Sequence, residues 1–86
     1  MENLNRWKQL NATIVNCSFY VGHTIDDFII CYYSNEFSGW LEYDINNNEL
    51  RMVSKDGILL DMISKDNLTQ EYVSKWLVNN FKTIVV

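Results

Sequence analysis

Hydrophobic and polar residues repeat with two different periods along the chain. Near the start, Leu4, Trp7 and Leu10 lie three positions apart, which predicts a short helix over residues 2–10. Beyond it, apolar and polar residues alternate over residues 13–21, a pattern typical of a strand with one buried face. The Gly-His-Thr segment that follows interrupts this alternation, so the strand is expected to end there.

Later segments predict four more strands. Residues 28–33 are continuously apolar, which is typical of a central strand covered on both faces. Trp40–Ile45 alternates, and two further strands follow turns at residues 46–48 and 55–57, where asparagine and glycine favour left-handed backbone conformations. The pattern predicts an antiparallel meander.

The side-chain charges suggest how the last three strands pair. A two-residue loop in the first hairpin would oppose Asp44 with Glu49, two like charges. A four-residue loop over 46–49 opposes Asp44 with Arg51 instead, and the next hairpin then opposes Arg51 with Asp61. This register predicts an apolar face made of Leu41, Tyr43, Ile45, Leu50, Met52, Leu60 and Met62. The opposite, mixed face consists of Trp40, Glu42, Asp44, Arg51, Val53, Leu59, Asp61 and Ile63.

A second helix is expected after the last of these strands. Asn67 is the predicted N-cap, with Gln70 three residues on completing a capping box. The apolar stripe consists of Leu68, Tyr72, Val73, Trp76, Leu77 and Phe81. Residues 81–86 are compatible with more helix or with a strand; their β-branched side chains favour the strand, whose free edge would allow pairing with a second copy.

The expected fold is therefore α+β, with about five antiparallel strands in a meander, a short N-terminal helix and a C-terminal helix packed on one face. At 86 residues the chain is long enough for a single domain, 1–86, with 48% hydrophobic residues to build its core. Cys17 and Cys31 are interpreted as reduced core thiols. With no apolar signal segment at the start, a cytoplasmic location is expected.

Charge is distributed unevenly. The net charge is −4, and no Lys or Arg occurs between Gln9 and Leu50. That stretch has a local charge of −6, from Asp26, Asp27, Glu36, Glu42, Asp44 and Glu49. An acidic half repels phosphate backbones and anionic membranes, so direct binding to nucleic acid or membrane is not expected. It would attract a protein with a basic surface, although an acidic surface also simply keeps a protein in solution.

The sequence contains few of the residue patterns that catalytic sites and metal sites require. His23 is the only histidine; with Asp26 or Asp27 it would form a base and its orienting group, but no serine in a strand–turn–helix context accompanies it. Two cysteines fourteen positions apart do not supply the close ligand pairs of zinc sites. The isolated glycines do not form a phosphate-binding loop. No enzyme activity, metal or cofactor is expected.

The mixed face is the candidate binding site. It combines an aromatic anchor with carboxylates, and interface hot spots are typically aromatic. The predicted partner-binding residues are Glu36, Phe37, Trp40, Glu42, Asp44 and Glu49. The alternative is that the N-terminal helix covers Trp40, with Trp7 against it, and that the carboxylates only line a solvated sheet face.

In size, acidity and lack of catalytic groups, the chain resembles small immunity proteins that neutralise bacterial toxins. The resemblance implies a tight, stoichiometric inhibitor whose region 36–49 meets the basic surface of a toxin or nuclease. Two alternatives stay open. One is a phage-encoded inhibitor that mimics nucleic acid through its acidic surface. The other is a structural or scaffolding subunit that forms a homodimer through its C-terminal edge.

Overall fold

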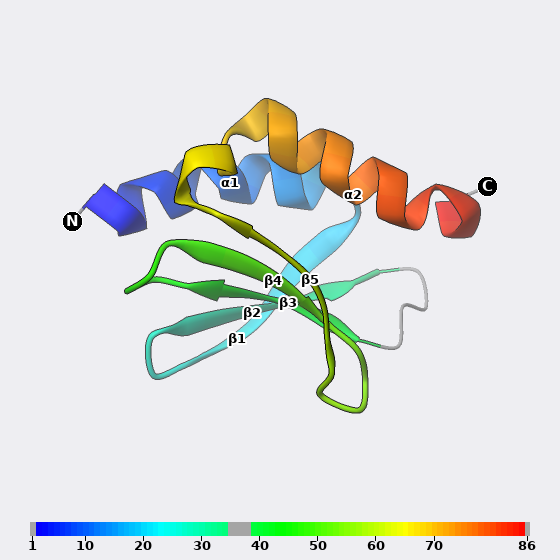
Figure 1. The fold of residues 1–86 in the computed structure, drawn as a ribbon, viewed down its shortest axis with the longest axis horizontal. Helices are drawn as coiled ribbons and strands as arrows, with labels where there is room; N and C mark the ends of the chain where they lie inside the picture. Colours follow the sequence, from blue (N-terminus) through cyan, green and yellow to red (C-terminus); the bar gives the residue numbers. More distant parts are fainter. Residues whose placement is uncertain (1, 35–38, 86) are drawn as a thin grey trace.

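Two helices cover one face of a five-stranded sheet (Figure 1). The computed structural model describes residues 2–34 and 39–85. In chain order the elements are α1 (Glu2–Asn16), β1 (Phe19–Ile25), β2 (Phe28–Tyr33), β3 (Trp40–Asp44), β4 (Glu49–Val53), β5 (Leu59–Ser64), the 3₁₀ turn η1 (Lys65–Asn67) and α2 (Gln70–Val85).

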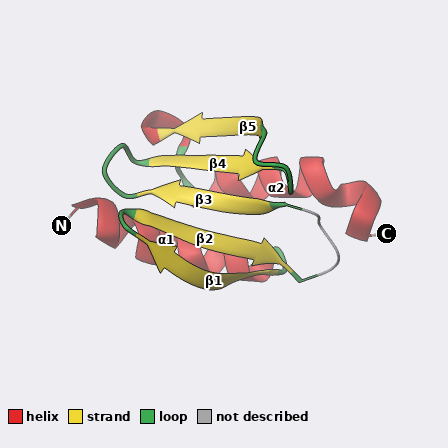
Figure 2. Cartoon of the chain, turned by 90° about the horizontal axis from the view of Figure 1, so that it is seen from below, coloured by secondary structure: helices red, strands yellow, loops and turns green. Residues whose placement is uncertain are grey.

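The sheet is an antiparallel meander in the order β1-β2-β3-β4-β5. This confirms the predicted α+β class and strand order. Figure 2 views the sheet from the side opposite the helices, and no helix crosses it there. The suggestion that the first helix covers Trp40 is wrong, because the ring of Trp7 stacks on Tyr43 of the opposite face, 5.3 Å away.

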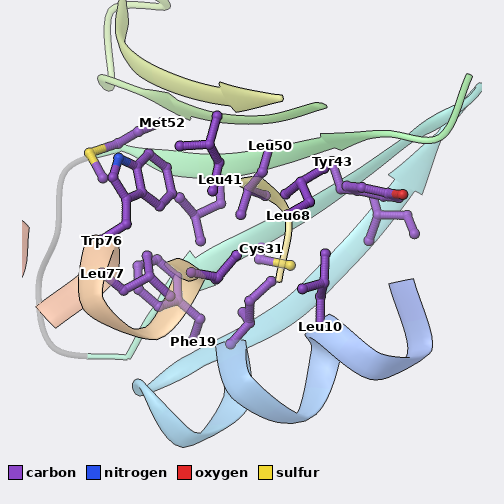
Figure 3. Packing of buried hydrophobic residues seen from close by; sticks show 14 of the residues in the cluster. Leu10, Phe19, Cys31, Leu41, Tyr43, Leu50, Met52, Leu68, Trp76 and Leu77 are labelled. Atoms are coloured by element: carbon purple, nitrogen blue, oxygen red, sulfur yellow. The ribbon is translucent and has the colours of Figure 1, made fainter. Parts of the chain in front are cut away.

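The core lies between the helices and the sheet (Figure 3). It draws side chains from both helices and all five strands, and several of them are completely buried, Ile14, Leu41, Tyr43, Leu50 and Val73 among them. Cys31 is buried in this cluster and Cys17 packs against it, both as free thiols. Burial raises the pKa of the Cys31 thiol to about 12, so it stays protonated in the folded protein.

Helix α1 is longer than the sequence pattern predicted. Residues 13–16 are helical rather than extended, because Ile14 continues the apolar stripe of Trp7 and Leu10 at helical spacing and is fully buried. The chain leaves the helix through Ser18, whose φ of 73° is the left-handed conformation that ends many helices.

Strand β1 also passes through the Gly-His-Thr segment, which was expected to interrupt it. Gly22 occupies a bulge, since Val21 pairs with Cys31 while His23 pairs with Ile30. A Cβ atom at Gly22 would lie 2.2 Å from Cε2 of Tyr32, so only glycine lets this ring pack directly over the strand.

The predicted registers of β3, β4 and β5 are both wrong. Asp44 does oppose Glu49, because Arg51 bonds to both carboxylates and removes their repulsion. In the second hairpin an irregularity between Met52 and Val53 shifts β5 by one position, so that Met52 opposes Asp61. A shift of one residue exchanges the faces of a strand. Ile63 is therefore buried in the core, whereas Leu60 and Met62, predicted to be inside, are exposed.

Helix α2 begins later than predicted and continues further. Thr69, not Asn67, provides the N-cap: its Oγ1 accepts a hydrogen bond from the amide of Tyr72 at 3.2 Å. Tyr72, predicted to lie in the buried stripe, is 43% exposed. Because the helix runs to Val85, the C-terminal segment is not the edge strand that its β-branched residues favoured. The edges of the sheet are β1 and β5.

Candidate functional site

The side of the sheet that faces away from the helices is called the open face here. Cross-strand pairing assigns it residues from all five strands, because directly opposed residues share a face. It consists of Tyr20, His23, Ile25, Phe28, Ile30, Tyr32, Trp40, Glu42, Asp44, Glu49, Arg51, Val53, Leu59, Met62 and Ser64. The uncovered face of a two-layer antiparallel sheet is normally polar. This one is mainly apolar and aromatic, apart from one cluster of charges.

A shallow pocket of about 160 Å³ lies on the open face over β1, β2 and β3. Its lining is formed by His23, Ile25, Ile30, Tyr32, Trp40 and Glu42. Ile30 is 6% exposed although it points away from the helical layer, so neighbouring side chains of the open face alone cover it. The pocket therefore has an apolar floor, aromatic walls and one carboxylate.

The indole of Trp40 is held in place by Glu42. Its Nε1–H donates a hydrogen bond to Oε1 of Glu42 at 2.8 Å. The other oxygen of Glu42, Oε2, lies 4.0 Å from Nη1 of Arg51. Glu42 thus fixes the aromatic wall with one oxygen and keeps a weakly paired oxygen beside the pocket.

Arg51 is the centre of the charged cluster. Its Nη2 donates to Oδ2 of Asp44 at 2.9 Å and to Oε1 of Glu49 at 2.7 Å, and its guanidinium lies 5.6 Å from the centre of the Phe28 ring. Burial disfavours the guanidinium's charge, but these hydrogen bonds and charges outweigh burial and raise the pKa of Arg51. Glu49 and Asp44 are therefore engaged within the protein.

Asp44 organises the turn between β3 and β4. It is 3% exposed, and its carboxylate accepts hydrogen bonds from the amides of Asn46 and Asn47, from Nδ2 of Asn47 and from Arg51. Burial alone would raise the pKa of Asp44, but the hydrogen bonds from Asn47 and Arg51 hold it below its ordinary value. Asp44 closes an Asx turn rather than meeting a partner as a free carboxylate.

The predicted site residues thus separate into groups. Trp40 and Glu42 line the pocket, whereas Asp44 and Glu49 bind Arg51. Glu36 and Phe37 lie outside the described residues. The sequence does not predict the pocket residues of β2, because the apolar run 28–33 indicates a strand covered on both faces. It does not predict those of β1, because that strand is expected to end at the Gly-His-Thr segment.

His23 belongs to the pocket rather than to a turn. Its ring lies 5.8 Å from that of Tyr32. Of the two neighbouring carboxylates, Asp27 accepts a hydrogen bond from Nδ2 of Asn46 at 2.7 Å, which joins the β1–β2 turn to the β3–β4 turn. The role of Asp27 seen here is thus to bridge two turns at one end of the sheet.

A second hollow lies on α2, with Tyr72, Lys75 and Asn79 among its lining residues. Lys75 forms an exposed pair with Glu71, one turn earlier on the same helix, at 3.2 Å. Exposed pairs of this kind contribute little to stability or recognition. The open face, where aromatic side chains from several strands converge, is the stronger candidate site.

Within residues 2–34 and 39–85, no three His, Cys, Asp or Glu side chains are grouped as a metal site. No helix in the same part of the chain is long and apolar enough to cross a membrane. Comparison with known proteins gives no significant match to a family model, to a curated protein or to a solved structure.

Proposed function

We propose that this protein is a non-catalytic binding module that captures a basic protein through the open face of its sheet. The observation that carries the proposal is the pocket at Trp40. Buried aromatic anchors dominate interface energies, and here the indole is already fixed by Glu42, so little side-chain entropy remains to be lost on binding.

The apolar character of the open face supports a protein partner. Side chains such as Tyr20, Ile25 and Met62 are more than 40% exposed on a face where water would favour polar residues. Apolar patches of this kind on small proteins mark interaction surfaces. Together with the pocket, they provide an area across which a folded partner can pack.

Charge supports a basic partner. Among the described residues of the open face, Glu42, Asp44 and Glu49 are opposed by Arg51 alone, and Asp26 and Asp27 lie in the turn at the same end. An excess of negative charge around an apolar centre steers a basic surface into contact and speeds association.

The biological role that fits best is a stoichiometric, cytoplasmic inhibitor or immunity protein that blocks a basic toxin or nuclease. Mimicry of nucleic acid is less well supported, because Asp44 and Glu49 are paired with Arg51 and do not form a free row of phosphate-like charges. A scaffold assembled through a C-terminal strand loses its basis, because α2 continues to Val85.

The test combines capture with a matched pair of variants. Tagged protein is incubated with host lysate, the captured protein is purified, and the affinity and stoichiometry are measured by calorimetry at low and high salt. We expect a basic protein bound one to one, with weaker binding at high salt. Trp40→Ala is expected to weaken it at least about 30-fold, the loss of a roughly 2 kcal/mol anchor.

The matched control is Tyr72→Ala, which removes an exposed aromatic ring from α2 on the other side of the molecule. It should leave the affinity unchanged. Binding that survives Trp40→Ala but is lost in Tyr72→Ala would place the interface on the helices and refute the proposal. So would recovery of nothing but further copies of this chain.

A further inference from the structure

The pocket of the open face has the chemistry of a site for a cationic side chain. Tyr32 and Trp40 provide π faces, which attract a guanidinium or an ammonium group. Ile25 and Ile30 provide apolar surface for the aliphatic stem that carries such a group. Glu42 adds a negative charge at the wall of the same hollow.

We propose that this pocket receives an arginine or lysine side chain of the partner, which makes it the residue-level specificity site of the interface. The inference rests on the proposed function, because it assigns the part of the basic partner that enters the open face. The charged head lies against Trp40 and next to Oε2 of Glu42, while its stem follows the isoleucines.

The arrangement of Glu42 supports a cation rather than an apolar guest. Its Oε1 accepts the indole hydrogen bond at 2.8 Å, whereas Oε2 has Arg51 only at 4.0 Å. Arg51 itself bonds more closely to Asp44 and Glu49, at 2.9 and 2.7 Å. An incoming cation can therefore pair with Oε2 without displacing an existing strong bond.

Neither lysine nor arginine lines the pocket, so none of its lining side chains carries a fixed positive charge. The side chain of Glu42 is 25% exposed, so a guest that covers it removes water from the ion pair and strengthens the attraction. An apolar guest of the same size would bury Oε2 of Glu42 with only the distant Arg51 contact at 4.0 Å to offset the lost water, which disfavours such a guest.

The experiment uses two small probes that differ essentially in charge. N-acetylarginine amide is titrated into the full-length ¹⁵N-labelled protein, and N-acetylcitrulline amide serves as the neutral, nearly isosteric control. Nuclear magnetic resonance follows the indole N–H signals of Trp7, Trp40 and Trp76, with the Trp40 signal assigned from its loss in Trp40→Phe. Trp7 on α1 and Trp76 on α2 belong to the helical layer, so their indole signals serve as internal controls.

We expect the arginine probe to move the Trp40 signal saturably, while the citrulline probe binds about three- to tenfold more weakly. Glu42→Gln retains an acceptor for the Trp40 indole, so the fold should persist while the preference for arginine disappears. Glu71→Gln, which removes an exposed carboxylate on α2, should leave the preference unchanged.

Equal shifts from the two probes, or no saturable shift from either, would overturn this assignment. Neither result would affect the proposed function, which depends on loss of partner binding in Trp40→Ala. Conversely, an arginine-selective pocket in a protein that captures no basic partner would retain the site and refute the function.

Discussion

The carboxylate of Asp44 closes the turn between β3 and β4 through bonds to two asparagines and Arg51. A second buried contact secures the same turn, because the hydroxyl of Tyr43 donates a hydrogen bond to Oδ1 of Asn48. Asn48 adopts a φ of 53°, a left-handed conformation that asparagine tolerates better than most residues. The turn is thus fixed by several polar contacts that a hydrophobic pattern does not reveal.

Stability is expected to fall in acid because of this carboxylate. The pKa of Asp44 is lower in the folded protein than its ordinary value of 3.8, so the unfolded state takes up the proton first. The contribution of the Asp44 carboxylate to stability is fully present above pH 3.8, and it is lost as the pH falls through the pKa of Asp44 in the folded protein. Asp44→Asn should lower the free energy of unfolding by roughly 1–3 kcal/mol near neutral pH. Below about pH 4 the variant and the wild type should become more alike in this free energy.

Urea unfolding at a series of pH values, from neutral to acid, measures the free energies of unfolding of the wild type and of Asp44→Asn. The control is Asp56→Asn, in the exposed turn before β5. It also removes one negative charge, and it should change the free energy of unfolding little at any pH. If the difference between Asp44→Asn and wild type stayed constant throughout the acid range, the assigned role of the carboxylate would be wrong.

At the scale of single elements, helix α1 and strand β1 show where a period-two pattern misleads. Val15 fits the predicted strand, but Ile14 is the residue that enters the core. The apolar residues Trp7, Leu10 and Ile14 also fit the stripe of a helix. In the folded protein α1 contacts α2, and this packing favours the helix over the strand in this segment. Tertiary packing therefore set the end of the helix.

Two alanine substitutions distinguish these assignments. Ile14→Ala is expected to destabilise the protein by about 2–5 kcal/mol, because it leaves a cavity between helix and sheet. Val15→Ala, at a position 51% exposed, should change stability by less than about 0.5 kcal/mol. Chemical denaturation gives both values, and the reverse order would restore the predicted strand.

Strand β5 is an apolar edge. Leu59 and Leu60, together with Ile58 just before the strand, are each more than 50% exposed. Asp61 accepts a hydrogen bond from the indole of Trp76 at 2.8 Å. The register shift that produces this arrangement could not be predicted from alternation, because a bulge changes the face of every residue beyond it without a required sequence signal.

Lysine substitutions test the orientation of this strand. Leu60→Lys should leave the free energy of unfolding nearly unchanged and should reduce self-association at high concentration, because a charged edge resists pairing. Ile63→Lys, at a position 5% exposed, should prevent folding at ambient temperature. Circular dichroism and sedimentation velocity measure these effects. Unfolding of Leu60→Lys would show that the predicted register was correct.

At the scale of the whole molecule, the strand order and the presence of both helices could be predicted from sequence, because each element has a recognisable apolar pattern: helical spacing, alternation or a continuous run. The candidate site could be predicted only in part. Trp40 and Glu42 are two residues apart on one strand, so alternation alone places them together. Their neighbours His23 and Ile30 come from other strands, and only the bulge at Gly22 brings His23 beside them.

The shared core predicts a single cooperative transition. Every helix and strand contributes at least one residue to one cluster, so none of them can detach without exposing apolar surface. Unfolding curves from far-ultraviolet circular dichroism and from tryptophan fluorescence should coincide. An earlier transition in one signal would show that α1 unfolds separately.

The helical layer also determines how this protein can be attached to something else. The outer ends of α1 and α2 lie at opposite ends of that layer, on the side away from the sheet's uncovered surface (Figure 1). A fusion partner, a label or an immobilisation tag joined ahead of Glu2 or after Val85 would leave the molecule from this layer. Either terminus can therefore serve as an anchor that displays the β-sheet outward.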